Sequence, residues 1–213
     1  VEAPAAPEDM VEERRYALEL RGGDGVPTVT AEFSNLGAAI RRVILHRYPE
    51  DLESKDAPEE NPIVLDFESA PALVLNGGGH GDRAGYKVAP AVSGEGLTFT
   101  RTLPDGVRFR RVVSLDDDYV LRVVDQWENP GDAAVTVPDT HLFLGPMRAM
   151  EGISQKFGPY VGVDAEHTEG IGQERYWKNI RDGLKEGDTY EKTFGHGVKW
   201  FSVKNKFFAQ VLT

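Results

Sequence analysis

Histidine, a common metal ligand and general base in proteins, is scattered along this sequence. No two of its five histidines are separated by three residues, the His-x-x-x-His spacing that sets two imidazoles on one helix face to bind zinc. Because the sequence contains no cysteine, a zinc site would need three distant histidines or carboxylates. We therefore predict no metal site. The histidines are His46, His80, His141, His167 and His196.

A glycine-rich segment, GGGHGDRAG at residues 77–85, has the composition of a phosphate-binding loop. It lacks the closing Gly-Lys-Ser or Gly-Lys-Thr, and no helical pattern follows it. The Gly-x-Ser-x-Gly turn that presents a nucleophilic serine is also missing. The sequence thus predicts neither a cofactor nor a covalent nucleophile.

Acid–base chemistry on a sugar requires carboxylates, or a carboxylate and a histidine, that converge in space. Three successive acids at residues 116–118 lie between two strongly alternating segments, where a hairpin turn explains them. His141 lies on another alternating segment and has no convincing glutamate partner, so we interpret it as a buried strand histidine. We predict no catalytic residue and no enzymatic activity.

The segment VKWFSVKNKFFAQVLT at residues 198–213 is rich in aromatic and basic side chains. Trp200, Val203 and Phe207 recur at helical spacing, which predicts a short helix before a final strand near 208–212. Its aromatic face either packs on a sheet or meets a partner or membrane surface. The residues of a candidate interaction surface are Tyr176, Trp177, Trp200, Phe201, Phe207 and Phe208.

Composition limits the class of protein. The net charge of −11 and the pI of about 4.9 exclude the basic face that a nucleic-acid-binding protein needs. No apolar run approaches a membrane span, and no signal peptide precedes the first strand. Residues 1–14 are acidic and carry prolines, which predicts a flexible linker. Residues 15–213 are expected to form a single β-sandwich domain.

Alternating segments separated by short turns must position all of these residues. VTAEFSN at 29–35 predicts a half-buried strand, and the next strand, 39–46, carries Arg41 and Arg42 on opposite faces. Further strands are expected at 15–20, 63–67, 73–75, 97–103, 107–115, 119–129 and 135–145. Pro104-Asp105-Gly106 is a turn sequence that makes a hairpin of 97–115. The pattern favours an all-β antiparallel sandwich.

Three blocks in this order resemble the large periplasmic domain of YidC, the Oxa-type bacterial membrane-protein insertase family. They are FSNLGAAIRRVILHRYPE, LTFTRTLPDGVRFRRVVSLDDDYVLRVVDQWENPGD and VKWFSVKNKFFAQVLT, and they cover about half of the chain. The resemblance implies an antiparallel β-supersandwich of the galactose mutarotase-like kind, with further strands after Thr213. It also implies a location on the periplasmic side of the inner membrane, tethered by transmembrane segments outside residues 1–213.

The same resemblance implies a non-catalytic role in membrane-protein insertion and folding. Expected partners are the Sec translocon accessory subunits SecF and SecD, and nascent membrane proteins that meet the family's membrane part. The SecF contact falls in a region that corresponds here to the poorly matching residues 146–197.

Two alternatives stay open. A carbohydrate-binding or aldose-epimerase-like protein would use the same fold, and THLFLG at 140–145 loosely resembles the histidine of mutarotases that precedes an aromatic residue. An adhesin-like secreted sandwich would bind through its long acidic loops. Sugar chemistry measured on the purified chain separates the first alternative from the insertase interpretation.

Overall fold

The computed structural model describes residues 11–51, 53–116, 119–137, 139–146, 162–167, 170–176, 197–204 and 209–213; for residue 167 and for 170–176 it describes the backbone alone. The chain divides into two compact units, Val1–Gly145 and Pro146–Thr213. The prediction of one domain over 15–213, preceded by a flexible linker, stays a prediction, and residues 1–10 lie outside the described residues.

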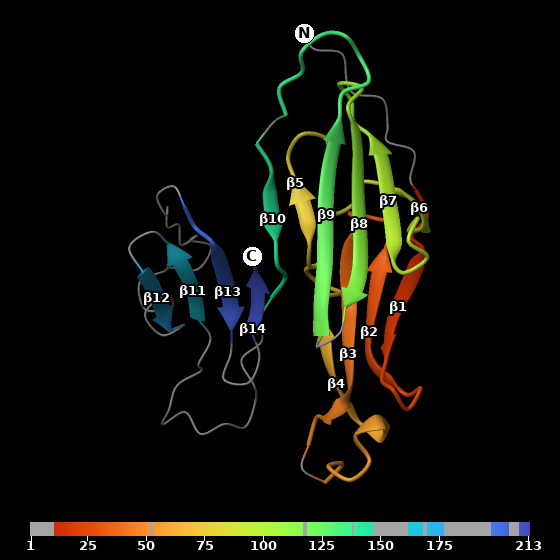
Figure 1. Ribbon diagram of the computed structural model, residues 1–213, viewed down its shortest axis with the longest axis vertical. Coiled ribbons are helices and arrows are strands. Elements are labelled where there is room, and N and C mark those ends of the chain that lie inside the picture. Colours follow the sequence, from red (N-terminus) through yellow and green to blue (C-terminus); the bar gives the residue numbers. More distant parts are fainter. Residues whose placement is uncertain are drawn as a thin grey trace. The chain divides into compact units, whose positions relative to one another are not determined.

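Unit 1 contains two four-stranded antiparallel sheets (Figure 1). The first sheet has the order β1-β2-β3-β4, formed by Arg15–Arg21, Pro27–Ser34, Ala39–Pro49 and Pro62–Asp66. The second sheet has the order β6-β7-β8-β9, formed by Lys87–Pro90, Leu97–Thr102, Arg108–Asp116 and Val120–Glu128. A short pair, β5 (Val74–Asn76) and β10 (His141–Phe143), and a 3-10 turn, η1 (Pro58–Glu60), complete the described elements of this unit. The predicted all-β antiparallel sandwich is confirmed.

The core of unit 1 lies between the inner faces of these two sheets. Phe33 of β2 contacts Phe99 of β7 with ring centroids 5.9 Å apart, and both side chains are fully buried. Phe109 and Val113 of β8 extend the same core. Alternation along β8 places residues 109, 111 and 113 inside, as the sequence predicts. In β2, by contrast, residues 28–31 are all buried, so side chains on both of its faces are covered.

The hairpin of β7 and β8 forms as its turn residues predict. Leu103 N donates to Val107 O at 2.8 Å, and Gly106, with φ +86°, closes the turn. Asp105 accepts a hydrogen bond from the Val107 amide at 3.1 Å. Proline at the first turn position and glycine at the left-handed position thus fix the register of the hairpin.

Unit 2 contains a third sheet with the order β12-β11-β13-β14, formed by Gly170–Tyr176, Gly162–His167, Trp200–Lys204 and Ala209–Leu212. The prediction of a helix beginning at Trp200 is wrong, because this segment is strand β13, paired on one side with β11 and on the other with β14. Aromatic and β-branched residues favour the strand conformation. Hydrogen bonding to two neighbouring strands stabilises it here, although three apolar residues of the segment have helical spacing. The final strand is confirmed at Ala209–Leu212. None of the described residues belongs to a helix long and apolar enough to cross a membrane.

Candidate functional site

The inner face of the second sheet carries a buried ion pair. Arg111 of β8 lies directly opposite Asp125 of β9. Its Nε donates to Asp125 Oδ1 and its Nη2 to Oδ2, both at 2.7 Å. The Arg111 side chain is 1% exposed, and that of Asp125 is 19% exposed. This is the bidentate geometry in which a guanidinium and a carboxylate hydrogen-bond most strongly.

The remaining donors of Arg111 reach two turns outside its own sheet. Nη1 donates to the carbonyl oxygens of Ala38, at 3.1 Å, and of Leu73. Both acceptor residues have left-handed backbones, with φ of 49° and 65°, which cost free energy in residues with a side chain. The guanidinium therefore joins β8, β9 and two strained turns, and this fourfold use leaves one N–H for any other partner.

An aromatic row lies beside the ion pair. Phe109 and Trp127 are opposite each other on β8 and β9, with ring centroids 5.1 Å apart. His80, from the glycine-rich segment, stacks edge-on against Phe109 at 4.6 Å. The His80 Nδ1 and Tyr86 hydroxyl atoms are 2.7 Å apart and share a hydrogen bond. The glycine-rich segment at 77–85 thus inserts a histidine between aromatic rings.

Glycine is required in this segment by close packing. A Cβ at Gly79 would lie 2.6 Å from the Pro104 ring, and the residue has φ +84°. Only a glycine satisfies both conditions without displacing the β7–β8 turn. The position of His80 is fixed by this contact together with the Tyr86 hydrogen bond.

Burial sets the protonation of the aromatic row. Desolvation, followed by the positive charges of Arg111 and Arg101, lowers the pKa of His80 below its ordinary value, although Asp125 opposes the shift. Desolvation raises the pKa of Tyr86 to about 12. Both side chains are therefore neutral near pH 7. His80 Nε2 and Trp127 Nε1 are buried atoms with no hydrogen-bond partner in the described part of the chain.

This arrangement favours a structural role over a catalytic one. The carboxylate that faces the row, Asp125, is occupied by Arg111, and the Tyr86 hydroxyl holds its proton too firmly to act as a base near neutral pH. No group of three potential metal ligands occurs among the residues that the structure describes. His141, interpreted from the sequence as buried, is exposed at the start of β10, because β10 pairs with β5 on one side and turns this side chain outward.

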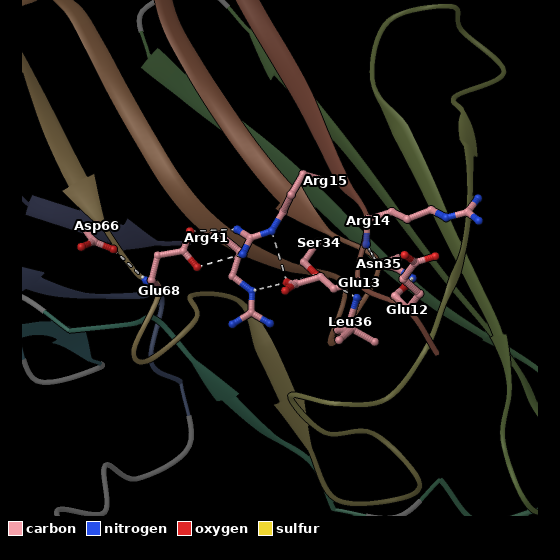
Figure 2. A network of polar contacts seen from close by, with 10 residues as sticks. All are labelled: Glu12, Glu13, Arg14, Arg15, Ser34, Asn35, Leu36, Arg41, Asp66 and Glu68. Carbon is pink, nitrogen blue, oxygen red and sulfur yellow. Dashed lines mark hydrogen bonds and ion pairs between the residues drawn. The ribbon is translucent and has the colours of Figure 1, made fainter. Parts of the chain in front are cut away.

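A second polar network ties the chain before β1 to the first sheet (Figure 2). Asn35 accepts a hydrogen bond from the Arg14 amide at 2.6 Å and donates one to the Glu12 carbonyl at 3.1 Å. Ser34 donates to Glu13 Oε1 at 2.6 Å. The same carboxylate pairs with Arg41 at 3.1 Å. Arg42 is exposed and lies opposite Glu32, and the register shift between Glu32 and Phe33 interrupts the alternation that predicted opposite faces for the two arginines.

Opposing effects set the charge of Glu13. Desolvation acts to raise the pKa of its carboxyl, but the Ser34 hydrogen bond and the positive charges of Arg41 and Arg15 outweigh it and lower the pKa below its ordinary value. Arg15 also makes a bidentate contact with Glu68, with Nη1 to Oε1 at 3.0 Å and Nη2 to Oε2 at 2.9 Å. Residues 12 and 14 are thus bound by their backbone groups to Asn35, and residues 13 and 15 are bound by their ionised side chains.

The two described members of the predicted interaction surface lie on opposite faces of the third sheet. Trp200 is paired with Glu166 of β11 and donates its Nε1 hydrogen to Glu166 Oε2 at 2.7 Å. Phe201 faces the other way, opposite Ala165, which is fully buried. Tyr176 is described by its backbone alone, and Trp177, Phe207 and Phe208 lie outside the described residues.

The Trp200 face of this sheet is held by charged pairs. Lys199 donates to Glu166 Oε1 at 2.8 Å, and Lys204 pairs with Asp164. Hydrogen bonds from Lys199 and then from Trp200 lower the pKa of Glu166 below its ordinary value. Val211, which follows on the adjacent strand β14, is 58% exposed and belongs to the same face, because it pairs with Ser202.

Two comparisons with known proteins show the family of this chain. The family model that describes the YidC periplasmic domain matches residues 26–213. The chain belongs to the YidC periplasmic domain family. A curated relative, the membrane protein insertase YidC of Agrobacterium fabrum, is 29% identical over 120 residues, which make up 54% of this chain and 18% of the relative. As a member of this family, the domain is located on the periplasmic side of the bacterial inner membrane.

The sequence analysis missed the Arg111–Asp125 pair, although a signal for it was present. Arg110 and Arg111 are adjacent on an alternating strand, so one of them must point inward. Asp125 is the single acid among the inward positions of β9. An inward cation and an inward acid on hairpin strands predict a cross-strand pair once the register is known.

Proposed function

We propose that this chain is a non-catalytic module of a YidC-type insertase that binds and positions other proteins during membrane-protein insertion. The observation that carries the proposal is the family match over residues 26–213. The use of Arg111 and Asp125 as a cross-link between segments supports a scaffold role. The insertase activity itself belongs to the membrane part of such proteins, which this domain accompanies.

The proposed partners are the Sec accessory subunits SecF and SecD, with nascent membrane proteins reached through the membrane part. We assign the contact to the Trp200 face of the third sheet. That face combines the exposed Val211 with a half-buried indole and two lysines, Lys199 and Lys204. Aromatic, aliphatic and basic groups together are typical of protein interaction surfaces.

Capture of SecF with the full-length insertase that carries this domain tests the proposal. Val211→Asp places a charge on the Trp200 face and is expected to reduce the recovery of SecF. Val64→Asp is the matched control, because Val64 is 37% exposed on β4 of unit 1 and far from this sheet in the sequence. Equal recovery of SecF with both variants and with the unmodified protein would contradict the assigned contact.

A further inference from the structure

A groove of about 950 Å³ opens beside β1 at one side of unit 1. Four segments line it: residues 17–20 of β1, the β6–β7 turn at 94–96, the end of β8 and the start of β9. The turn is preformed, since Ala91 N donates to Gly96 O at 3.0 Å and Gly94 N to Ala91 O at 2.9 Å. The volume lies in the range of established ligand sites.

One wall of this groove is an open strand edge. In the first sheet β1 pairs with β2 alone among the described strands, and Figure 1 shows it at the margin of the sheet. The Arg14 carbonyl accepts the Asn35 amide, so even-numbered residues of β1 direct their backbone groups toward β2. Ala17 and Glu19 therefore direct N–H and C=O groups outward, where an added strand can bond to them.

The floor of the groove is apolar. Leu18 and Leu20 of β1 and Leu115 of β8 are half-buried, and Leu18 and Leu115 pack against the core. Alternate side chains of an added strand would meet this floor, while its other side chains would point to solvent or to the rim.

The rim of the groove is acidic. Three carboxylates line it, those of Glu19, Glu95 and Asp116. Asp116 is bound to Arg122 at 2.9 Å, and Glu19 is bound to Arg21. Within the described residues, Glu95 is exposed and makes no ion pair. The residues before β1 are an unsuitable occupant, because positions 1–10 contain three acids and no base.

We propose that this groove binds an extended peptide segment of another protein that alternates basic and apolar residues, by adding it as a strand to the free edge of β1. The backbone bonds to Ala17 and Glu19, the apolar side chains cover the leucines, and the basic side chains meet the rim carboxylates. This inference adds a second contact, in unit 1, to the proposed interaction role, and it can fail without affecting the Trp200 face.

Fluorescence anisotropy with labelled nonapeptides tests the groove on the purified chain. A peptide that alternates lysine and valine is expected to bind. The affinity of a peptide that alternates glutamate and valine is expected to be lower by a factor of about ten. The lysine–valine peptide with every backbone nitrogen methylated lacks the backbone donors and should not bind. Comparable binding of the lysine and glutamate peptides would overturn the proposal.

Substitutions in the chain locate the site. Ala17→Pro removes an outward N–H from an edge strand, where proline is tolerated, and should weaken binding about tenfold. Glu95→Lys should weaken binding about fivefold, whereas Glu128→Lys, which changes the net charge equally outside the groove, should leave it unchanged. The unfolding midpoint of each variant verifies its fold.

Three results count against the proposal. Equal losses in the Glu95 and Glu128 variants would show that the peptide responds to net charge alone. Unchanged binding by Ala17→Pro would exclude the β1 edge. Self-association of the chain that Ala17→Pro abolishes would identify a second copy as the occupant in place of a basic peptide.

Discussion

Two arginines of unit 1 make the same bond in different surroundings. Arg111 and Arg15 each grip a carboxylate from another segment with two hydrogen bonds, at 2.7 Å for Asp125 and at 2.9 and 3.0 Å for Glu68. The first arginine is 1% exposed and the second 37%. Water competes for the hydrogen bonds of the outer pair, Arg15–Glu68, but it is excluded from the inner pair, Arg111–Asp125. Breaking the inner pair therefore leaves a buried charge without a partner. Identical chemistry therefore contributes unequally to the stability of the fold.

The largest effect is expected from removing the inner arginine. Arg111→Met leaves Asp125 without its cation and two left-handed turns without their donor, which should lower the free energy of unfolding by about 3–5 kcal/mol. Urea denaturation measures the loss. Arg110→Met is the adjacent control, since Arg110 lies on the outer face and bonds Gln126 at 3.3 Å; it should change stability by about 0.5 kcal/mol or less. Similar losses of unfolding free energy in the two variants would contradict the claim that the buried arginine contributes more to stability.

The next largest effect is expected at Asn35, in the polar network that ties the chain before β1 to the first sheet. Asn35 is 5% exposed and bonds both Arg14 and Glu12, so Asn35→Ala should cost about 1–3 kcal/mol and release residues 11–14. Faster cleavage at Glu12 and Glu13 by a glutamate-specific protease reports the release. Asn129→Ala removes the same kind of paired bonds from an exposed turn and should have little effect.

Acid should weaken the inner region through His80. Because the pKa of His80 is lowered in the fold, the unfolded chain binds the proton first as pH falls below the ordinary histidine value. The contribution of neutral His80 to the free energy of unfolding is therefore complete above about pH 6.5. Below this pH it declines by at most about 1.4 kcal/mol per pH unit for one proton. Unfolding midpoints between pH 5.5 and 8 measure the decline. His80→Gln should flatten this part of the profile, and an unchanged slope would remove His80 as its cause.

The smallest effect is expected at the outer ion pair. Glu68→Gln keeps the shape of the side chain and removes its charge, and should cost about 1 kcal/mol or less. Because exposed pairs are screened by ions, the cost should shrink as salt is added. A loss equal to that of Arg111→Met would show that exposure does not decide the strength of these pairs.

Local sequence patterns predict many of the strands and turns of this fold. Alternation located β2, β8 and β9, and Pro104-Asp105-Gly106 placed the hairpin, since each depends on neighbouring residues alone. The segment at Trp200 was misjudged because its three apolar positions suit a helix, whereas its strand conformation depends on pairing with β11 and β14. Long-range pairing of this kind is invisible to a local period.

The polar clusters were less predictable for the same reason. Arg111 meets Asp125 across the β8–β9 hairpin, but it reaches the carbonyl groups of Ala38 and Leu73 only once two turns outside that sheet have packed against it. His80 was visible as part of a glycine-rich segment, but the rings that enclose it come from β8 and β9. Such clusters combine residues from distant segments, and the sequence alone does not show the register and packing that bring these residues together.

The central claim is that the inward polar cluster around Arg111 holds the sandwich together and performs no reaction. Polarimetry of aldose mutarotation with the purified chain tests it most directly, because an aldose-epimerase-like protein on the same fold is the alternative that the sequence leaves open. The account predicts a rate equal to that of buffer alone. A rate above buffer that His80→Gln abolishes while the chain stays folded would contradict it.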